Sequence, residues 1–333
     1  MIYSVQYMRA IAALMIVIHH AAWKGEQYSS DPLSWFNVGG IGVDLFFIIS
    51  GYIMCYTVDR NRTDFLSFIK ARFFRIIPLY WVLTTLALGV YIFFPDKINS
   101  SGGSTNLIAS YTLFPVEGKF LINNGWTLSY ELLFYFIFST CLAFKTLYKY
   151  LIPCFIIFLL VVSGLLIGEG HYLIDFLTSY YLLEFMLGIF AFYISKKTNK
   201  NLPLGGFLIS CSVTAVILVN INNLGFERVI QYGVPAFFFF LGMLFMEPYF
   251  NKNKSKFFSS LLKALGDSSY SLYLFHPFSL VVFSIVLSRL GLADYGVVFV
   301  VGLVLTSLIS GHLCYLLLEK PLVKLMKTNK PLH

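Results

Sequence analysis

The chain has 333 residues, of which 58% are hydrophobic, 18% are aromatic and only 12% are charged, with a mean hydropathy of +0.77. A soluble globular protein carries about 25% charged residues, so this composition excludes a water-soluble body of this size. The net charge of +8 comes mostly from loops between apolar segments and gives no support for nucleic-acid binding. The sequence therefore predicts a polytopic protein embedded in a lipid bilayer.

Apolar segments long enough to span a membrane recur along the whole chain, where a spanning helix needs about 17–25 residues. They predict an all-α bundle of about ten transmembrane helices. We expect residues 1–333 to form a single transmembrane domain with no appended soluble domain. In chain order the predicted spans are 4–23, 39–58, 73–94, 127–144, 150–168, 172–195, 203–221, 229–247, 264–289 and 294–318.

Lysine and arginine residues are concentrated in alternate loops, which the positive-inside rule assigns to the cytoplasm. An even number of spans places both termini on that side, so both are predicted to be cytoplasmic. The opposite side, including the long polar loop at 95–126, holds Lys24, Lys97, Lys119, Arg228 and Arg289. The cytoplasmic side holds Arg60, Arg62, Lys70, Arg72, Arg75, Lys145, Lys149, Lys196, Lys197, Lys200, Lys252, Lys254, Lys256, Lys263, Lys320, Lys324, Lys327 and Lys330.

The first span carries two ionisable residues, Arg9 and His20, among apolar ones. A separation of eleven residues places them on one helix face, about 16 Å apart along the axis. His19 points about 100° away from this face. Ionisable groups are expensive in lipid, so an aligned pair favours a functional role. The alternative is that each side chain is bonded to a neighbouring helix and serves only packing.

The second and fourth spans each bring a carboxylate to the predicted depth of His20. Asp44 lies in GGIGVDLFFIISGY and Glu131 in WTLSYELLFY, each about a turn and a half from the external end. An imidazole beside a carboxylate can act as a general base, since the carboxylate fixes the tautomer and stabilises the imidazolium. His20, Asp44 and Glu131 are therefore the candidate catalytic residues. The alternative is a structural knot of polar contacts between helices.

The third span begins with KARFFRIIPLYW, in which Arg72 and Arg75 share one helix face at the predicted cytoplasmic mouth. Guanidinium groups bind phosphate through two parallel hydrogen bonds, so this pair could hold a phosphate-bearing ligand. The alternative is ordinary positive-inside flanking of a span.

The ninth span begins with GDSSYSLYLFHPF. Asp267 and Ser268 give a helix-start signal, and His276 falls near the predicted midplane. Pro277 follows it and should weaken the helix there, as in spans that line a cavity. The alternative for His276 is a packing histidine with satisfied hydrogen bonds.

Five of these elements, taken together and in order, resemble the membrane-bound acyltransferase 3 family, which O-acylates bacterial surface polysaccharides. They are Arg9 with His20 eleven residues later, then GVDLFFIISGY, RFFR, WTLSYE and SYSLYLFHPF. Many relatives carry a double glutamate in the fourth element, whereas Leu132 follows Glu131 here. In this respect the chain is similar to the exopolysaccharide O-acetyltransferases of the family.

The resemblance implies a membrane-bound, acyl-CoA-dependent O-acyltransferase. It implies that His20 is essential for acyl transfer and that Arg9, Arg72 and Arg75 serve the acyl donor. That donor would be acetyl-CoA, bound from the cytoplasm. The expected enzyme is a multi-pass protein of the bacterial cytoplasmic membrane.

The expected acceptor is a hydroxyl of a cell-surface or exported polysaccharide, or of its lipid-linked precursor, at the outer face. Trp126, Ser129 and His276 are the candidate residues for binding it. No metal is expected, since the five cysteines show neither paired spacing nor a metal-binding motif.

A transporter or flippase for a lipid-linked sugar is the competing interpretation, because buried ionisable residues also suit a carrier. Transporter folds are often built from duplicated halves, and the sequence shows no convincing internal repeat. The predicted clustering of His20, Asp44 and Glu131 near one face also favours the enzyme.

Overall fold

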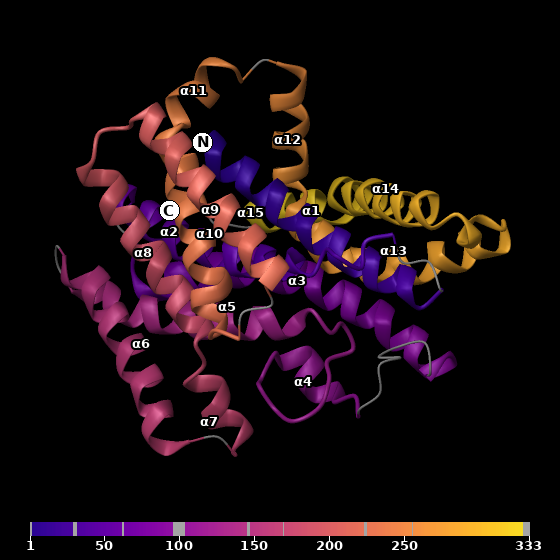
Figure 1. The fold of residues 1–333 in the computed structure, drawn as a ribbon. Helices are drawn as coiled ribbons and strands as arrows, with labels where there is room; N and C mark the ends of the chain where they lie inside the picture. Colours follow the sequence, from indigo (N-terminus) through magenta and orange to yellow (C-terminus); the bar gives the residue numbers. More distant parts are fainter. Residues whose placement is uncertain are drawn as a thin grey trace. The chain divides into compact units, whose positions relative to one another are not determined.

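The computed structural model describes residues 2–28, 32–61, 63–95, 104–144, 147–168, 170–222, 225–254 and 256–328. Four residues used to predict the topology, Arg62, Lys97, Lys145 and Lys330, lie outside these ranges. Within them the chain is helical, and its β structure is limited to an isolated bridge between Thr105 and Lys119. Figure 1 shows the helices in sequence colours.

The chain forms two compact units, each made of two separate stretches. The first unit comprises Met1–Ile53 and Leu187–Tyr315, and the second comprises Met54–Met186 and Leu316–His333. Three helical elements contribute residues to both units: α2 (Ile41–Arg60), α8 (Tyr181–Lys197) and the π-helical turn η6 (Tyr315–Glu319).

The first unit is built around α1, which packs against α12, α13 and α14. A second group consists of α9 and α10, which pack closely on each other. The elements are α1 (Tyr3–Glu26), η1 (Val38–Gly40), α9 (Leu202–Asn222), the π-helical turn η4 (Val229–Gly233), α10 (Val234–Phe245), α11 (Glu247–Lys252), α12 (Phe257–Asp267), α13 (Ser269–Arg289), η5 (Leu292–Asp294) and α14 (Gly296–Cys314).

The second unit is built around α3 and α5, with α4 packed on α3, α6 on α5 and α7 on α6. Aromatic side chains dominate its interior, including Phe134 and Phe138 of α5, which are fully buried. The elements are α3 (Phe65–Phe93), α4 (Leu107–Thr112), α5 (Gly125–Thr140), η3 (Cys141–Ala143), α6 (Tyr148–Ile167), α7 (Tyr172–Leu177), the π-helical turn η6 (Tyr315–Glu319) and α15 (Lys320–Thr328).

The predicted all-α membrane fold is confirmed. Nine helical runs in the described ranges are long and apolar enough to cross a membrane, and the predicted span at 229–247 is the shorter apolar helix Val229–Phe245. The nine are Tyr3–Glu26, Val38–Arg60, Phe65–Phe93, Gly125–Ala143, Tyr148–Ile167, Tyr172–Lys197, Leu202–Asn222, Ser269–Arg289 and Gly296–Met326.

Helix α3 begins at Phe65, eight residues before the predicted start of the third span at 73. Asp64 is its N-cap, and the carboxylate accepts a hydrogen bond from the Ser67 amide at 3.4 Å. Hydrogen bonds from the Ser67 side chain and backbone lower the pKa of the Asp64 carboxyl. The capping carboxylate is therefore ionised at neutral pH, and its contribution to stability is lost only as the pH falls through the lowered pKa.

The predicted helix start near Ser268 is confirmed, because α12 ends at Asp267 and α13 starts at Ser269. The Ser268 hydroxyl donates back to the carbonyl oxygens of Ala264 and Leu265 rather than capping α13. Gly266 brings this junction against α1, since a Cβ there would lie 2.9 Å from the carbonyl carbon of Gln6. Pro277 does not interrupt α13, which continues to Arg289.

The first helix receives its N-terminal cap from a distant part of the chain. Glu247 of α11 accepts hydrogen bonds from the amides of Tyr3 at 2.9 Å and Ser4 at 2.7 Å. No side chain next to the start of α1 fills this role. The carboxylate satisfies two amides that a helix leaves unpaired at its start, and it also complements the positive end of the helix dipole.

Candidate active site

Two histidines from different helices of the first unit form a hydrogen-bonded pair. His20 of α1 and His276 of α13 lie with Nδ1 and Nε2, respectively, 2.9 Å apart. The rings are inclined by only 20° and their centroids are 5.0 Å apart, so they meet nitrogen to nitrogen rather than face to face. His276 is fully buried, and the sequence predicted it near the midplane but not beside His20.

The hydrogen bonds of His276 fix the tautomers of both rings. Its Nδ1 lies 3.1 Å from the carbonyl oxygen of Leu272, which can only accept, so Nδ1 carries the proton. In a neutral ring Nε2 is then the acceptor, and His20 Nδ1 must donate to it. Nε2 of His20 is left with a lone pair and makes no hydrogen bond to the described residues. That atom can act as a base or a nucleophile.

The prediction that a carboxylate would orient His20 is wrong for Nδ1, because His276 occupies that nitrogen. Asp44 is instead bonded to Arg228, with Oδ2 and Nη2 2.7 Å apart. Arg228 Nη2 also donates to the Gly40 carbonyl at 3.2 Å. A fully buried carboxylate needs a charge partner of this kind, and Asp44 is 0% exposed.

The π-helical turn η4 follows Arg228 directly. Pro235 lies at the start of α10, where its ring would clash with the carbonyl of Gln231 in a regular α-helix. A wider turn relieves that clash, and single π turns within helices are frequently found at functional sites.

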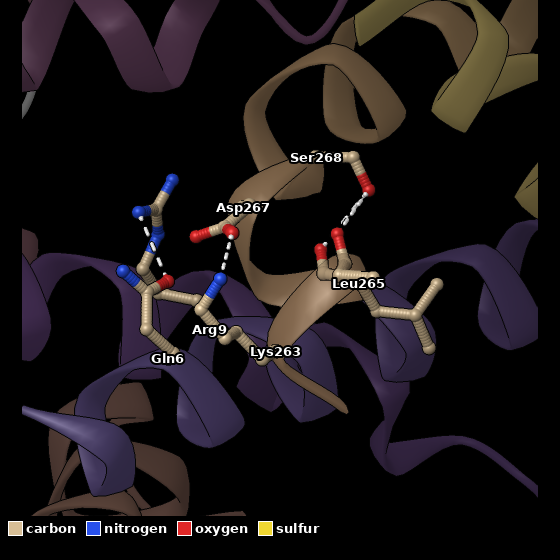
Figure 2. A network of polar contacts seen from close by, with 7 residues as sticks. Gln6, Arg9, Lys263, Leu265, Asp267 and Ser268 are labelled. Atoms are coloured by element: carbon tan, nitrogen blue, oxygen red, sulfur yellow. Dashed lines mark hydrogen bonds and ion pairs between the residues drawn. The ribbon is translucent and has the colours of Figure 1, made fainter. Parts of the chain in front are cut away.

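Arg9 lies on α1 opposite the junction of α12 and α13 (Figure 2). Its Nη1 is 3.5 Å from Gln6 Oε1. At the same junction Lys263 Nζ is 3.2 Å from Asp267 Oδ2. The predicted basic group on the first span is thus set in a polar network on one side of α1.

In the second unit Arg72 and Arg75 lie on α3, but their environments differ. Arg75 is exposed, whereas Arg72 is partly buried with its guanidinium 5.7 Å from the centre of the Phe68 ring. Arg72 Nε is buried and has no hydrogen-bond partner among the described residues. Arg72 is also within electrostatic range of Glu131 and Tyr135 on α5.

The predicted depths of Arg72 and Glu131 in the membrane remain predictions. The sequence placed Arg72 at the cytoplasmic mouth and Glu131 near the external end. Because α3 begins at Phe65, Arg72 lies about two turns inside the helix, with its guanidinium within electrostatic range of Glu131. Glu131 accepts a hydrogen bond from the Tyr135 hydroxyl at 3.0 Å.

Trp126 and Ser129, both predicted to bind the acceptor, line one pocket of about 310 Å³ in the second unit. Both lie on the first turns of α5, facing α7. His276, predicted to share their role, belongs to the first unit and is bonded to His20, so its observed contact is with the candidate base.

The described residues contain no group of three or more His, Cys, Asp or Glu side chains arranged to hold a metal ion. None of the five cysteines, all of them in described ranges, is in a disulfide.

Sequence reasoning missed two partners, His276 for His20 and Arg228 for Asp44. The spacing of residues along one helix cannot reveal which other helix packs against it. A weak signal existed for each: His276 directly precedes Pro277, and Arg228 stands at the start of an apolar span.

The fold and these polar groups define a multi-pass membrane protein that carries ionisable side chains on its apolar helices. A family model for an acyltransferase domain, that of the acyltransferase 3 family, matches residues 2–314. The chain therefore belongs to this family. The resemblance seen in the five sequence elements is confirmed over nearly the whole chain.

Several characterised or named proteins are similar to the chain. The exopolysaccharide production protein ExoZ of Rhizobium meliloti (strain 1021) is 29% identical over 87% of this chain and 91% of its own length. The putative acetyltransferase ORF330 of Acidianus two-tailed virus is 25% identical over 81% of this chain and 80% of its own. O-acetyltransferase OatA of Staphylococcus aureus is 26% identical over 95% of this chain but 56% of its own length. No solved structure gave a significant match.

Proposed function

We propose that this protein is an O-acetyltransferase that moves an acetyl group from cytoplasmic acetyl-CoA to a hydroxyl of a polysaccharide. The acceptor is a cell-surface or exported polysaccharide, or its lipid-linked precursor, at the outer face of the bacterial cytoplasmic membrane. Family membership supports acyl transfer. Relatives named for exopolysaccharide production and for O-acetyl transfer support this acceptor class and this acyl group.

The observation that carries the proposal is the hydrogen-bonded chain from Leu272 through His276 to His20. It leaves a lone pair on His20 Nε2, the atom that must take a proton from the acceptor hydroxyl. The alkoxide then attacks the thioester carbonyl, the tetrahedral intermediate collapses, and the carbon–sulfur bond breaks. The CoA sulfur leaves with the proton that His20 had taken, so the ring returns to its starting form.

The same lone pair could attack the thioester itself and give an acetyl-imidazole on His20. Rapid quenching and mass spectrometry of protein mixed with acetyl-CoA alone distinguishes the two routes. Acetyl on His20 indicates the covalent route, and unmodified protein that still acetylates a glycan indicates direct transfer.

The donor would be held by Arg72 and Arg75, because CoA carries a pyrophosphate and a further phosphate. A buried guanidinium nitrogen of Arg72 that has no hydrogen-bond partner among the described residues suits an anionic ligand. Arg9, which lies within the apolar helix α1, is assigned to the same donor.

The test is acetyl transfer by purified protein in nanodiscs, with labelled acetyl-CoA and an oligosaccharide from the native polysaccharide. We expect label in the glycan, no transfer by His20→Ala, and near-normal transfer by His19→Ala. Flux of the glycan across the membrane without consumption of acetyl-CoA would favour a flippase and overturn the proposal.

The donor site is tested by direct binding of acetyl-CoA. Arg72→Ala should weaken binding by about 10- to 150-fold, the effect of losing a hydrogen bond to a charged group. Lys70→Ala is the matched control, since Lys70 lies on the same helix and is exposed. Equal affinity of the Arg72 and Arg75 variants and wild type would limit the two arginines to a role in topology.

A further inference from the structure

The pocket in the second unit is walled by aromatic side chains from three helices and a loop. Two pairs are in close contact, Trp126 with Tyr181 at 5.1 Å between ring centroids and Tyr130 with Phe176 at 4.3 Å. These contacts hold the rings as one cluster. The six aromatic lining residues are Phe120, Trp126, Tyr130, Tyr172, Phe176 and Tyr181.

One carboxylate, Asp175 of α7, shares this pocket with the aromatic rings. No described residue donates a hydrogen bond to that carboxylate, so it can accept bonds from a ligand. Ser129 adds a hydroxyl whose proton is directed to the Gly125 carbonyl at 3.5 Å, which leaves its lone pairs as acceptors. Lysine and arginine are absent from the described residues that line the pocket.

These groups match the two surfaces of a sugar ring. The ring faces carry C–H groups, which pack against the electron-rich faces of aromatic rings. The ring edge carries hydroxyls, which donate to a carboxylate. The pocket volume of about 310 Å³ lies at the lower end of the range of about 300–1,000 Å³ for ligand sites, which suits a small ligand unit.

Other ligand classes fit less well. An acyl chain would bury the Asp175 carboxylate without a partner, which is costly. A nucleotide would bring phosphates beside that carboxylate with no basic side chain in the lining to balance them. The carboxylate of an acidic sugar would likewise be repelled by the Asp175 carboxylate.

We infer that this pocket binds one uncharged sugar ring of the acceptor and discriminates against acidic sugars. The inference rests on the proposed function, because it names the part of the acceptor that the enzyme recognises. Asp175 accepts hydrogen bonds from the ring hydroxyls, and the aromatic cluster covers the ring faces.

The test is equilibrium binding to the full chain in nanodiscs without any acyl donor. The probes are neutral tetrasaccharides, cellotetraose and laminaritetraose, and the acidic tetragalacturonate. We expect at least one neutral probe to bind and the acidic probe to bind more weakly. Failure of both neutral probes, or tighter binding of tetragalacturonate, overturns the inference.

Variants locate the binding in the pocket. Asp175→Asn should lower the affinity for the neutral probe by about tenfold or more, and it should reduce the difference in affinity between the neutral and the acidic probe. Tyr172→Ala should lower the affinity for the neutral probe by about 3- to 10-fold through loss of ring contact. Tyr148→Ala is the control, an exposed tyrosine outside this lining. Wild-type affinity in both pocket variants overturns the assignment.

Acetyl-transfer assays separate this inference from the proposed function. If Asp175→Asn raises the KM for the glycan but not for acetyl-CoA, both stand. If the wild type acetylates glycan and the variants keep its acceptor KM, only the pocket assignment fails. If neutral probes bind in the pocket but acetyl-CoA is never consumed, only the proposed function fails.

Discussion

The His20–His276 hydrogen bond gives each ring one defined tautomer. Either nitrogen of a free imidazole can carry the proton, and a hydrogen bond at one nitrogen decides which of them does. In the proposed mechanism His276 would act through His20 and would therefore be a positioning residue. That role does not require His276 to contact the substrate.

Replacing His276 should lower turnover without weakening donor binding. In His276→Ala the Nδ1–H of His20 loses its acceptor, and the tautomer with a lone pair on Nε2 is no longer favoured. We expect kcat to fall by roughly 10³- to 10⁴-fold, as when a catalytic imidazole takes the wrong tautomer. The measurement is acetyl transfer per folded molecule, beside the Kd for acetyl-CoA.

The conservative variant His276→Gln separates positioning from packing. Its amide oxygen can accept from His20 Nδ1, so it should recover part of the lost turnover. Equal activity of the Ala and Gln variants, both well folded, would argue against control of the tautomer.

The Asp44–Arg228 ion pair should contribute substantially to the free energy of unfolding, although the Arg228 side chain is partly exposed. Arg228→Met leaves the wholly buried carboxylate of Asp44 without a charge partner. Loss of one partner of a fully buried pair costs about 3–5 kcal/mol, and partial exposure of Arg228 reduces this to about 2–3 kcal/mol. Thermal unfolding in detergent measures the effect.

The double variant Arg228→Met with Asp44→Asn is the control for that prediction. Removing the carboxylate charge should restore most of the lost stability, since the burial of an unpaired charge is the cause. Equal unfolding temperatures of the single and double variants would contradict this explanation.

At the scale of helices, hydropathy predicts where spans lie but not where they begin. The segment that includes Lys70, Arg72 and Arg75 lowers local hydropathy, so the predicted third span began at 73, whereas Asp64 caps α3 well before it. By contrast, the start of α13 after Ser268 was predictable from the preference of Asp and Ser for helix starts, although the Ser268 side chain bonds back into α12 and does not cap α13.

Sequence patterns do not predict which side chains of different helices form hydrogen bonds with each other. The spacing of Arg9 and His20 correctly gives one helix, yet the atom that bonds His20 is 256 residues away in sequence. Only packing of α1 against α13 determines that contact.

Glu247 should stabilise α1 from a distance. Glu247→Ala removes the acceptor for the Tyr3 and Ser4 amides, and loss of a helix cap costs about 1–2 kcal/mol. Glu247→Gln should lie between wild type and Ala, since one amide oxygen can still accept. Unfolding temperatures of the three proteins test this, and wild-type stability of the Ala variant would show that the cap contributes nothing.

For the whole molecule, the predicted orientation can be tested with two cysteines in a cysteine-free background. Ser104 precedes α4, and Asn199 follows α8, and both are exposed. The charge pattern predicts that Ser104 faces outward and Asn199 faces the cytoplasm. A membrane-impermeant maleimide should therefore label Ser104→Cys in intact cells, and Asn199→Cys only after lysis. Labelling of both in intact cells would reject the topology.

The turn η4 also limits which changes in length this chain can tolerate. One residue fewer between Val229 and Gly233, together with replacement of Pro235, would let the turn close with ordinary α-helical spacing. Arg228 would then swing by about 100° around the axis of α10 and shift by about 1.5 Å along it, away from Asp44. Homologues that lack a residue here should therefore also lack the carboxylate at the position of Asp44, or carry their arginine one position away. A change of length in this turn and a change of charge are thus expected to be inherited together.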